Sequence, residues 1–254
     1  MISEKLISIA TKIIFVIIPI YFISMIFYPF WKGGFDWKYV HSVWYTWQAL
    51  NVGVLAFLSS FIAFSINRYS IEKQRMRDFI AERALLPHAV SELCSYLEQS
   101  FQSIFEGYNR CCRGMAERKI PLTSEKVNIP ETAILSFQSC IRVAEPDVAE
   151  YLAKILNELQ VCNSRIENMY LSFNGKSPLV NTSDNFLAYM IDVAVLRAKL
   201  DKIFDYARGE RKFESSKITS KNLQTSFREM GLNLEQMKEL QVKVVNRYGS
   251  IKNT

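Results

Sequence analysis

The chain has little of what enzymes use for catalysis or metal binding. It contains two histidines, His41 and His88, and its five cysteines form neither a CxxC motif nor a Cys–His pair with metal-ligand spacing. It also lacks a P-loop, a GxSxG or HExxH motif, a dinucleotide-binding glycine fingerprint and a nuclease-type carboxylate cluster. The sequence therefore predicts a protein that is not an enzyme, without catalytic residues, metal site, cofactor or small-molecule substrate.

Charged residues are absent from two long stretches near the N-terminus, residues 13–31 and residues 39–67. A helix needs about 20 mostly apolar residues to cross a hydrocarbon core about 30 Å thick. The first stretch is longer than the apolar core of most signal peptides and ends without a small-residue cleavage site. The sequence therefore predicts two retained transmembrane helices, over about residues 13–31 and 44–67, in an N-terminal hairpin of residues 1–67.

Aromatic residues crowd the connection between these stretches. It contains or borders all four tryptophans of the chain: Trp31, Trp37, Trp44 and Trp47. Amphipathic rings collect at the level of the lipid headgroups, so the cluster predicts a membrane interface around a short turn at Gly33 and Gly34. A ligand-binding aromatic patch is the alternative interpretation.

Basic residues are unevenly distributed around the two spans. Lys5 and Lys12 precede the first span, and Lys32 and Lys38 lie in the connection. Four basic residues follow the second span: Arg68, Lys73, Arg75 and Arg77. The positive-inside rule then places both termini in the cytoplasm. Because all five cysteines follow the second span, we expect them to be reduced thiols.

The second predicted span is less uniformly apolar than the first. It carries the small or polar residues Gln48, Asn51, Gly53, Ser59 and Ser60. Such residues let helices approach closely and form hydrogen bonds across their interface. Packing of the two spans against each other is one interpretation, and an oligomer or a pore lined by Gln48 and Asn51 is the other.

Helical periodicity continues beyond residue 67. Apolar residues at spacings of three and four, from Leu86 to Tyr108, predict a helix that runs on from the second span, either continuous or kinked at Pro87. Its proposed linking residues are Arg83, Leu86, Pro87, Leu93 and Tyr96. Further helices are predicted over about 130–143, from 146 onward and over 182–208. The predicted fold is all-α, a transmembrane hairpin followed by an antiparallel helical bundle of residues 68–209.

The last segment, residues 210–254, holds most of the net charge of +6. Its predicted contact residues are Arg211, Lys212, Lys217, Lys221 and Arg228. Such a basic tail, with a short helix over 234–248, could contact anionic lipid or nucleic acid, or be an ordinary solvated surface. Within the bundle, Asp192 and Asp201 lie near lysines and arginines of the same predicted helix, which indicates local ion pairs.

One stretch carries a resemblance to known proteins. The segment Arg83–Pro87, with sequence RALLP, and the following Ser91–Tyr96, with sequence SELCSY, resemble a region found just after the second span of bacterial two-span membrane proteins. The segment also resembles the membrane effectors that accompany retron reverse transcriptases in anti-phage defence. The resemblance covers the hairpin and about 30 residues after it.

This resemblance implies a toxin-like effector in the bacterial inner membrane. It would be held inactive by a reverse transcriptase bound to its RNA and DNA, and would impair the membrane, as a homo-oligomer, when released. The alternative is a membrane-anchored helical scaffold or receptor that recruits a cytoplasmic protein and does no damage to the membrane.

Overall fold

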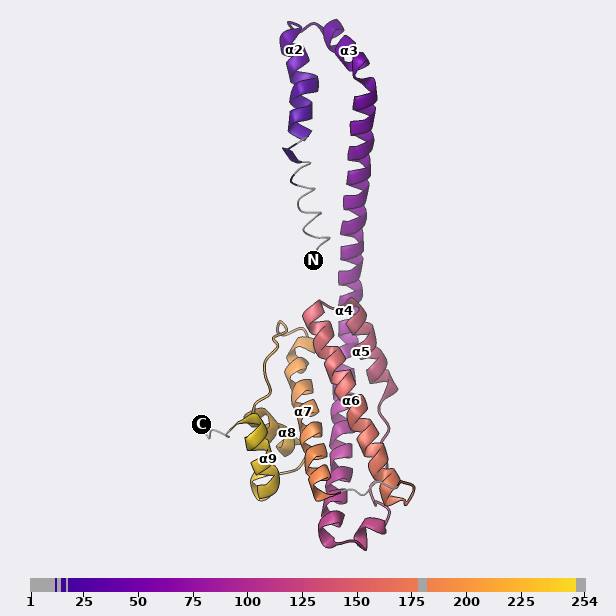
Figure 1. Cartoon of the computed structure of the whole chain (residues 1–254), viewed down its shortest axis with the longest axis vertical. Helices are drawn as coiled ribbons and strands as arrows, with labels where there is room; N and C mark the ends of the chain where they lie inside the picture. The colour runs from indigo at the N-terminus through magenta and orange to yellow at the C-terminus, as the bar shows by residue number, and fades with distance from the viewer. Residues whose placement is uncertain (1–11, 13–14, 17, 178–181, 250–254) are drawn as a thin grey trace. The chain divides into compact units, whose positions relative to one another are not determined.

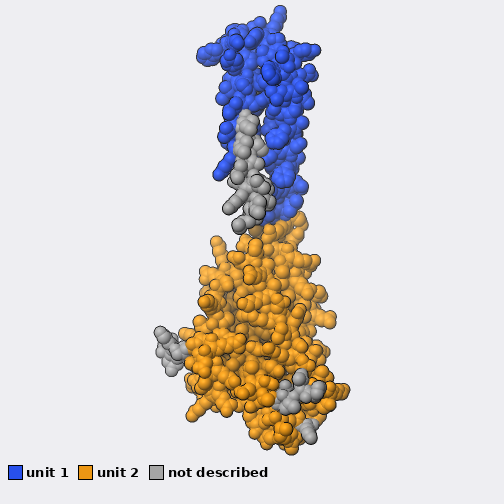
Figure 2. Space-filling view, in the orientation of Figure 1, with its two compact units in different colours: residues 1–72 blue, residues 73–254 orange. Residues whose placement is uncertain are grey.

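The computed structural model describes residues 12, 15–16, 18–177 and 182–249. These residues are mostly helical and include no strand, so the all-α prediction is confirmed for them. The chain forms two compact units, residues 1–72 and 73–254 (Figure 2). The division lies between residues 72 and 73, where the sequence predicted a boundary after residue 67, and residues 210–254 belong to the second unit.

The first unit contains the predicted first span and the aromatic connection. Residues 15–16 and 18–22 are helical, and residues 13, 14 and 17 of the predicted span lie outside the described residues. A π-helical turn, η1 (Ile23–Phe27), then leads into α2 (Tyr28–Lys32). The next helix, α3, spans Trp37–Thr46, and α4 starts at Gln48.

The predicted turn is formed with left-handed backbone at two positions. Gly34 has φ +59°, which glycine adopts without cost, and Phe35 has φ +65°. Asp36 then caps α3, because its side chain accepts a hydrogen bond from the backbone N–H of Lys38 at 3.0 Å. The second span was predicted to begin near residue 44, but α3 ends at Thr46 and α4 begins after Trp47.

Helix α4 (Gln48–Arg113) is 66 residues long and belongs to both units. It contains Pro87 in its interior, so the prediction of a helix that runs on from the second span past this proline is confirmed. A proline cannot donate the regular helical hydrogen bond. The helix continues past Pro87 all the same. Four residues later, the Ser91 hydroxyl donates a hydrogen bond to the Pro87 carbonyl oxygen at 3.1 Å.

The second unit packs the last part of α4 with α5 (Glu131–Val143), α6 (Pro146–Phe173) and α7 (Ser183–Ala207) (Figure 1). All three helices begin where proline or a capping residue predicted. Pro130 precedes α5, Pro146 is the first residue of α6, and the Thr182 side chain accepts from Asn185 N at the start of α7. Their apolar faces form one core, in which Phe101, Phe137 and Phe186 are almost completely buried.

The C-terminal segment contains a helix that the sequence analysis missed. Helix α8 (Ser220–Glu229) begins with a reciprocal capping box between Thr219 and Asn222. A short 3₁₀ turn, η3 (Leu234–Gln236), and α9 (Lys238–Tyr248) follow. Because Phe227 and Leu240 are fully buried in the common core, this segment is part of the bundle and not a separate tail.

Candidate membrane-spanning unit and charged clusters of the bundle

Helix α4 has an exposed apolar surface along its first half. Among the described residues it is the one helix long and apolar enough to cross a membrane, and none of the residues in its most apolar stretch is buried. A core helix of a soluble protein would bury such residues. Two spans were predicted, and one such helix is found among the described residues. The first predicted span contains residues that lie outside the described ones.

Trp44 has a structural role beyond the predicted interface position. Pro29 has no backbone N–H, so the carbonyl of Met25 cannot receive the regular helical hydrogen bond from it. The indole Nε1 of Trp44 donates to this carbonyl at 2.8 Å. The tryptophan of α3 therefore satisfies an acceptor that proline leaves open, which matters most where no water is available.

Another hydrogen bond joins the first predicted span to α4. The hydroxyl of Tyr21 donates to Asn51 Oδ1 at 2.6 Å, and Asn51 Nδ2 lies 3.5 Å from the Trp44 carbonyl oxygen. Asn51 thus forms a hydrogen bond with the first predicted span within this unit, whereas packing of two membrane spans stays a prediction. The structure gives no such role to Gly53, where an added Cβ would meet nothing within 4 Å, or to Ser60, which bonds within its own helix.

The remaining predicted residues of this unit are exposed. Trp31 is 84% exposed, Trp37 is 64% exposed and Trp47 is 52% exposed. Gln48 and Ser59 are also exposed. These positions are compatible with contact to a surrounding apolar phase, because water would otherwise cover large aromatic surfaces.

The predicted linking residues lie at the start of the bundle core. Leu86, Leu93 and Tyr96 are buried, and the Tyr96 hydroxyl donates to Asn163 Oδ1 at 2.9 Å. The Arg83 guanidinium lies over the rings of Phe79 and Tyr206, while Pro87 is half-buried. These residues therefore join α4 to α6 and α7 within the second unit.

Arg75 has a structural role that the positive-inside rule does not predict. Its Nε and Nη2 donate to the carbonyls of Val143 and Ala144, at 3.1 and 2.9 Å. These carbonyls belong to the C-terminal end of α5, where the helix leaves acceptors unsatisfied. The side chain therefore caps α5.

A largely enclosed arginine, with a side chain 13% exposed, pairs with three carboxylates where α4, α7 and α8 meet. Arg197 of α7 forms ion pairs with Glu98 at 3.8 Å, with Glu229 at 3.1 Å and with Asp201 one turn further on. Its Nη1 also contacts the Cys94 sulfur at 2.9 Å. Burial, together with the neighbouring Glu229, outweighs the attraction of Arg197 and raises the pKa of Asp201 to about 6. Of the local ion pairs predicted for α7, the one between Arg197 and Asp201 is present.

A groove lies between α6, α7 and the C-terminal α9. It has a volume of about 800 Å³ and is lined by residues of all three helices. Lys199 is only 8% exposed and pairs with Glu158 of α6. Asp192 pairs with Arg165 of α6 and lies 3.9 Å from Arg247 of α9. The predicted local pairing of Asp192 was therefore wrong, because its partners come from other helices.

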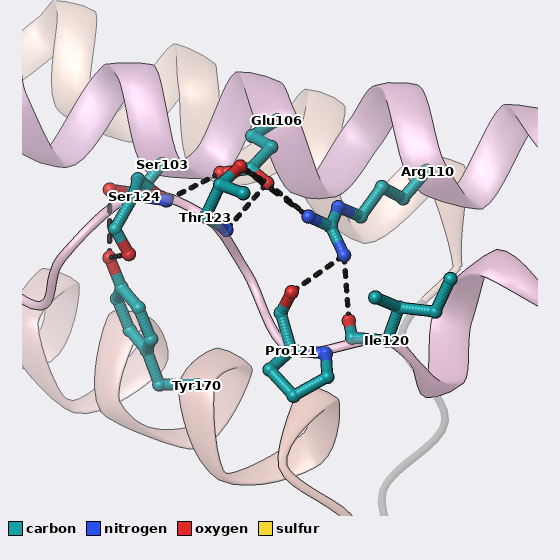
Figure 3. Close-up of polar contacts among 8 residues, drawn as sticks. All are labelled: Ser103, Glu106, Arg110, Ile120, Pro121, Thr123, Ser124 and Tyr170. Carbon is teal, nitrogen blue, oxygen red and sulfur yellow. Dashed lines mark hydrogen bonds and ion pairs between the residues drawn. The ribbon is translucent and has the colours of Figure 1, made fainter.

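Glu106 organises the connection between α4 and α5 (Figure 3). It accepts hydrogen bonds from the backbone N–H groups of Thr123 at 2.8 Å and Ser124 at 2.9 Å, and it pairs with Arg110 at 2.5 Å. Burial opposes its ionisation, but the bonds from Thr123 and Ser124 prevail and lower its pKa to about 2. Arg110 in turn donates to two carbonyls of the same connection, and the Tyr170 hydroxyl donates to Ser103 Oγ at 2.9 Å. These hydrogen bonds and the ion pair hold the connection between α4 and α5 against the two helices α4 and α6.

The predicted basic contact residues are spread over the surface of the C-terminal segment. The exposed residues are Arg211, Lys212, Lys217, Lys221 and Arg228. Arg211 lies 3.4 Å from Asp205, and the Lys217 carbonyl accepts a hydrogen bond from Lys202. Lys221 and Arg228 lie on α8, whose opposite face enters the core. They therefore belong to a folded surface.

Within the part of the chain that the structure describes, no group of three or more histidine, cysteine, aspartate or glutamate side chains could hold a metal ion. No protein-family model, no curated protein and no solved structure matches this chain.

Proposed function

We propose that this protein is a membrane-anchored, toxin-like effector of a bacterial anti-phage system. A two-span hairpin would hold it in the inner membrane with both termini in the cytoplasm. The bundle would bind a cytoplasmic partner, a protein or a ribonucleoprotein such as a reverse transcriptase with its RNA and DNA. Release from this partner would let the chain assemble and impair the membrane.

The observation that carries this proposal is that no residue in the most apolar stretch of α4 is buried. A side chain such as Leu55, Ile62 or Ile66, each more than half exposed, is costly in water and favourable in lipid. The same helix continues into a bundle whose charged clusters are occupied by ion pairs between helices. This combination supports a protein that acts by insertion and assembly.

Membrane potential in bacteria that express the chain alone tests the proposal. A voltage-sensitive dye should report depolarisation before growth stops. The matched control is the double variant Leu55→Asp/Ile62→Asp, because carboxylates in the centre of a span oppose insertion. Both positions are exposed, so the substitutions leave the bundle core intact. An unchanged potential with the native chain, at an expression level confirmed in the membrane fraction, would contradict the proposal.

The proposed orientation can be tested with native Cys112. It is exposed, whereas the four other cysteines are buried, and burial raises the pKa of Cys94 to about 12 and of Cys140 to about 11. Since the thiolate is the reactive form, a membrane-impermeant maleimide should label Cys112 and little else. Labelling is expected only after the membrane has been opened. Labelling of intact spheroplasts would place the bundle outside.

A membrane-anchored scaffold is the second candidate, and the groove between α6, α7 and α9 favours it, because such a surface can receive a partner. Replacing residues 1–67 with an unrelated two-span anchor separates the two functions. A scaffold should still recruit its partner after this exchange, whereas an effector should lose its effect on membrane potential.

A further inference from the structure

Helix α4 carries a heptad pattern on its exposed side. Two sets of positions alternate at spacings of three and four residues from Val52 to Ile80, as the a and d positions of a coiled coil do. The a positions are Val52, Ser59, Ile66, Lys73 and Ile80, and the d positions are Leu55, Ile62, Tyr69 and Met76. Four consecutive heptads of this kind are enough to indicate supercoiled helix pairing.

Every member of this stripe is exposed in the single chain. The apolar members are between 52% exposed, at Met76, and 63% exposed, at Ile66 and Tyr69. The stripe ends where the bundle begins, because the next d position, Arg83, lies over Phe79 and Tyr206. Phe57 and Phe64, at f positions on the opposite side, are also exposed, at 57% and 53%, so the stripe is distinguished by its heptad spacing and not by exposure alone.

Lipid does not account for the whole stripe, if the chain is placed in the membrane as proposed above. Met76 and Ile80 follow the uncharged stretch and lie among Lys73, Arg77 and Asp78. Hydrocarbon does not extend into such a charged region, so lipid does not cover these two side chains, whereas a second helix with the same spacing would. A partner with the same succession of apolar and then mixed residues would match the stripe along its full length.

The residues beside the stripe indicate that this partner is a second copy of α4 in parallel register. In a parallel pair, each g position faces the e position five residues later on the other helix. Glu72 is a g position and Arg77 is the matching e position, so the two copies would form two Glu72–Arg77 ion pairs. The other e positions before the bundle are small and allow close approach: Ala56, Ala63 and Ser70.

We infer that the stripe from Val52 to Ile80 is the surface through which the protein self-associates as a parallel, in-register pair of α4 helices. The partner is a second copy of this chain. Lys73 at an a position is a polar residue of the kind that fixes register and the number of helices. This pairing is the assembly that the proposed function requires. The membrane placement of residues 52–66 of the stripe rests on that proposed function.

Cysteine cross-linking of the full chain in membrane vesicles tests this inference. In a Cys112→Ser background, Met76→Cys and Ile80→Cys place a thiol at a d and an a position. Ile71→Cys and Leu85→Cys are matched controls at f positions, with 60% and 57% exposure. Because a disulfide needs Cα atoms within about 7 Å, oxidation should give at least about five-fold more covalent dimer at 76 and 80 than at 71 and 85.

A charge exchange tests the register independently. In the Ile80→Cys chain, Glu72→Arg would place two cations, Arg77 and the new arginine, opposite each other in the two copies, and should reduce the yield of covalent dimer several-fold. Adding Arg77→Glu restores opposite charges and should restore this yield. Both residues are exposed, so folding is unaffected. Equal cross-linking at all four cysteine positions, or no rescue by the double exchange, would overturn the inference. The two proposals can fail separately. If the cross-linking pattern is found without depolarisation, the effector function is refuted and the α4 interface stands. If depolarisation occurs without the cross-linking pattern, the α4 interface is refuted and the effector function stands.

Discussion

Asp201 offers a direct test of how the charged cluster of α4, α7 and α8 contributes to stability. Its carboxylate pairs with Arg197, which also pairs with Glu98 and Glu229, so three carboxylates share one arginine. The neutral variant Asp201→Asn keeps an acceptor for Arg197 and removes one of three negative charges. We expect it to stabilise the bundle at neutral pH.

The expected magnitude follows from the pKa. Burial raises the pKa of Asp201 from its ordinary value of 3.8 to about 6, and each unit of difference corresponds to about 1.4 kcal/mol. The full difference is therefore about 3 kcal/mol. Because the Asp201 side chain is 35% exposed, solvent screening reduces this to roughly 1–2 kcal/mol. For a unit of this size, that gain raises Tm by about 3–6 °C.

The pH dependence has a defined sign. A pKa that is higher in the folded protein means that protonation favours folding. The contribution of Asp201 to the free energy of unfolding is complete below about pH 3.8 and is lost as the pH rises through about 6. The advantage of Asp201→Asn should therefore be full at pH 7.5, smaller at pH 5 and absent near pH 4.

Thermal unfolding followed by circular dichroism at 222 nm, on the full chain in detergent, measures this effect. Tryptophan fluorescence is unsuitable, because all four tryptophans lie within residues 31–47, outside the bundle. The matched control is Asp205→Asn, one turn along α7, where the carboxylate lies 3.4 Å from Arg211 at the surface. A lower Tm for Asp201→Asn at pH 7.5, or a gain that does not change with pH, would refute the reasoning.

Three further predictions concern other contacts. Trp44→Phe should leave the Met25 carbonyl without its donor and cost about 1–2 kcal/mol, which we expect to see as a lower yield of membrane-inserted chain, whereas Trp31→Phe should have no such effect. Glu158→Gln should cost about 3 kcal/mol by removing the counter-charge of a buried ammonium, and Lys199→Met added to it should recover most of the loss in a double-mutant cycle of urea unfolding. Glu106→Ala should cost about 2 kcal/mol and expose residues 114–130 to limited proteolysis. Because hydrogen bonds lower the Glu106 pKa to about 2, this last loss should be constant from pH 5 to 8 and disappear only as the pH falls below 4.5.

Local signals in the sequence predicted much of the fold. The uncharged stretch, the starts at Pro130 and Pro146 and the cap at Thr182 depend on neighbouring residues, and each led to the observed helix boundary within a few residues. Helix α8 was missed because its polar surface obscures its apolar positions, although the Thr219–Asn222 capping box was present in the sequence. Its burial depends on contacts with α7 and α4 that no local pattern contains.

The candidate sites were less predictable, because their partners are distant in sequence. Asp192 was expected to pair within α7, yet it contacts residues 27 positions earlier in α6 and at the C-terminal end in α9. Trp44 was expected only at an interface, and its bond to Met25 depends on how the two arms of the first unit meet. Periodicity specifies which face of a helix is buried, but it does not specify which charged side chain lies opposite.

The most enclosed charged groups of the bundle make contacts between its structural elements. Arg197 and Lys199 are largely enclosed by the bundle, and each forms an ion pair that joins two helices. Glu106 accepts hydrogen bonds from the loop that follows α4. The exposed surface that remains regular is the heptad stripe of α4. Its alternation of apolar residues, with Glu72 and Arg77 placed five positions apart, is complementary to itself in parallel register.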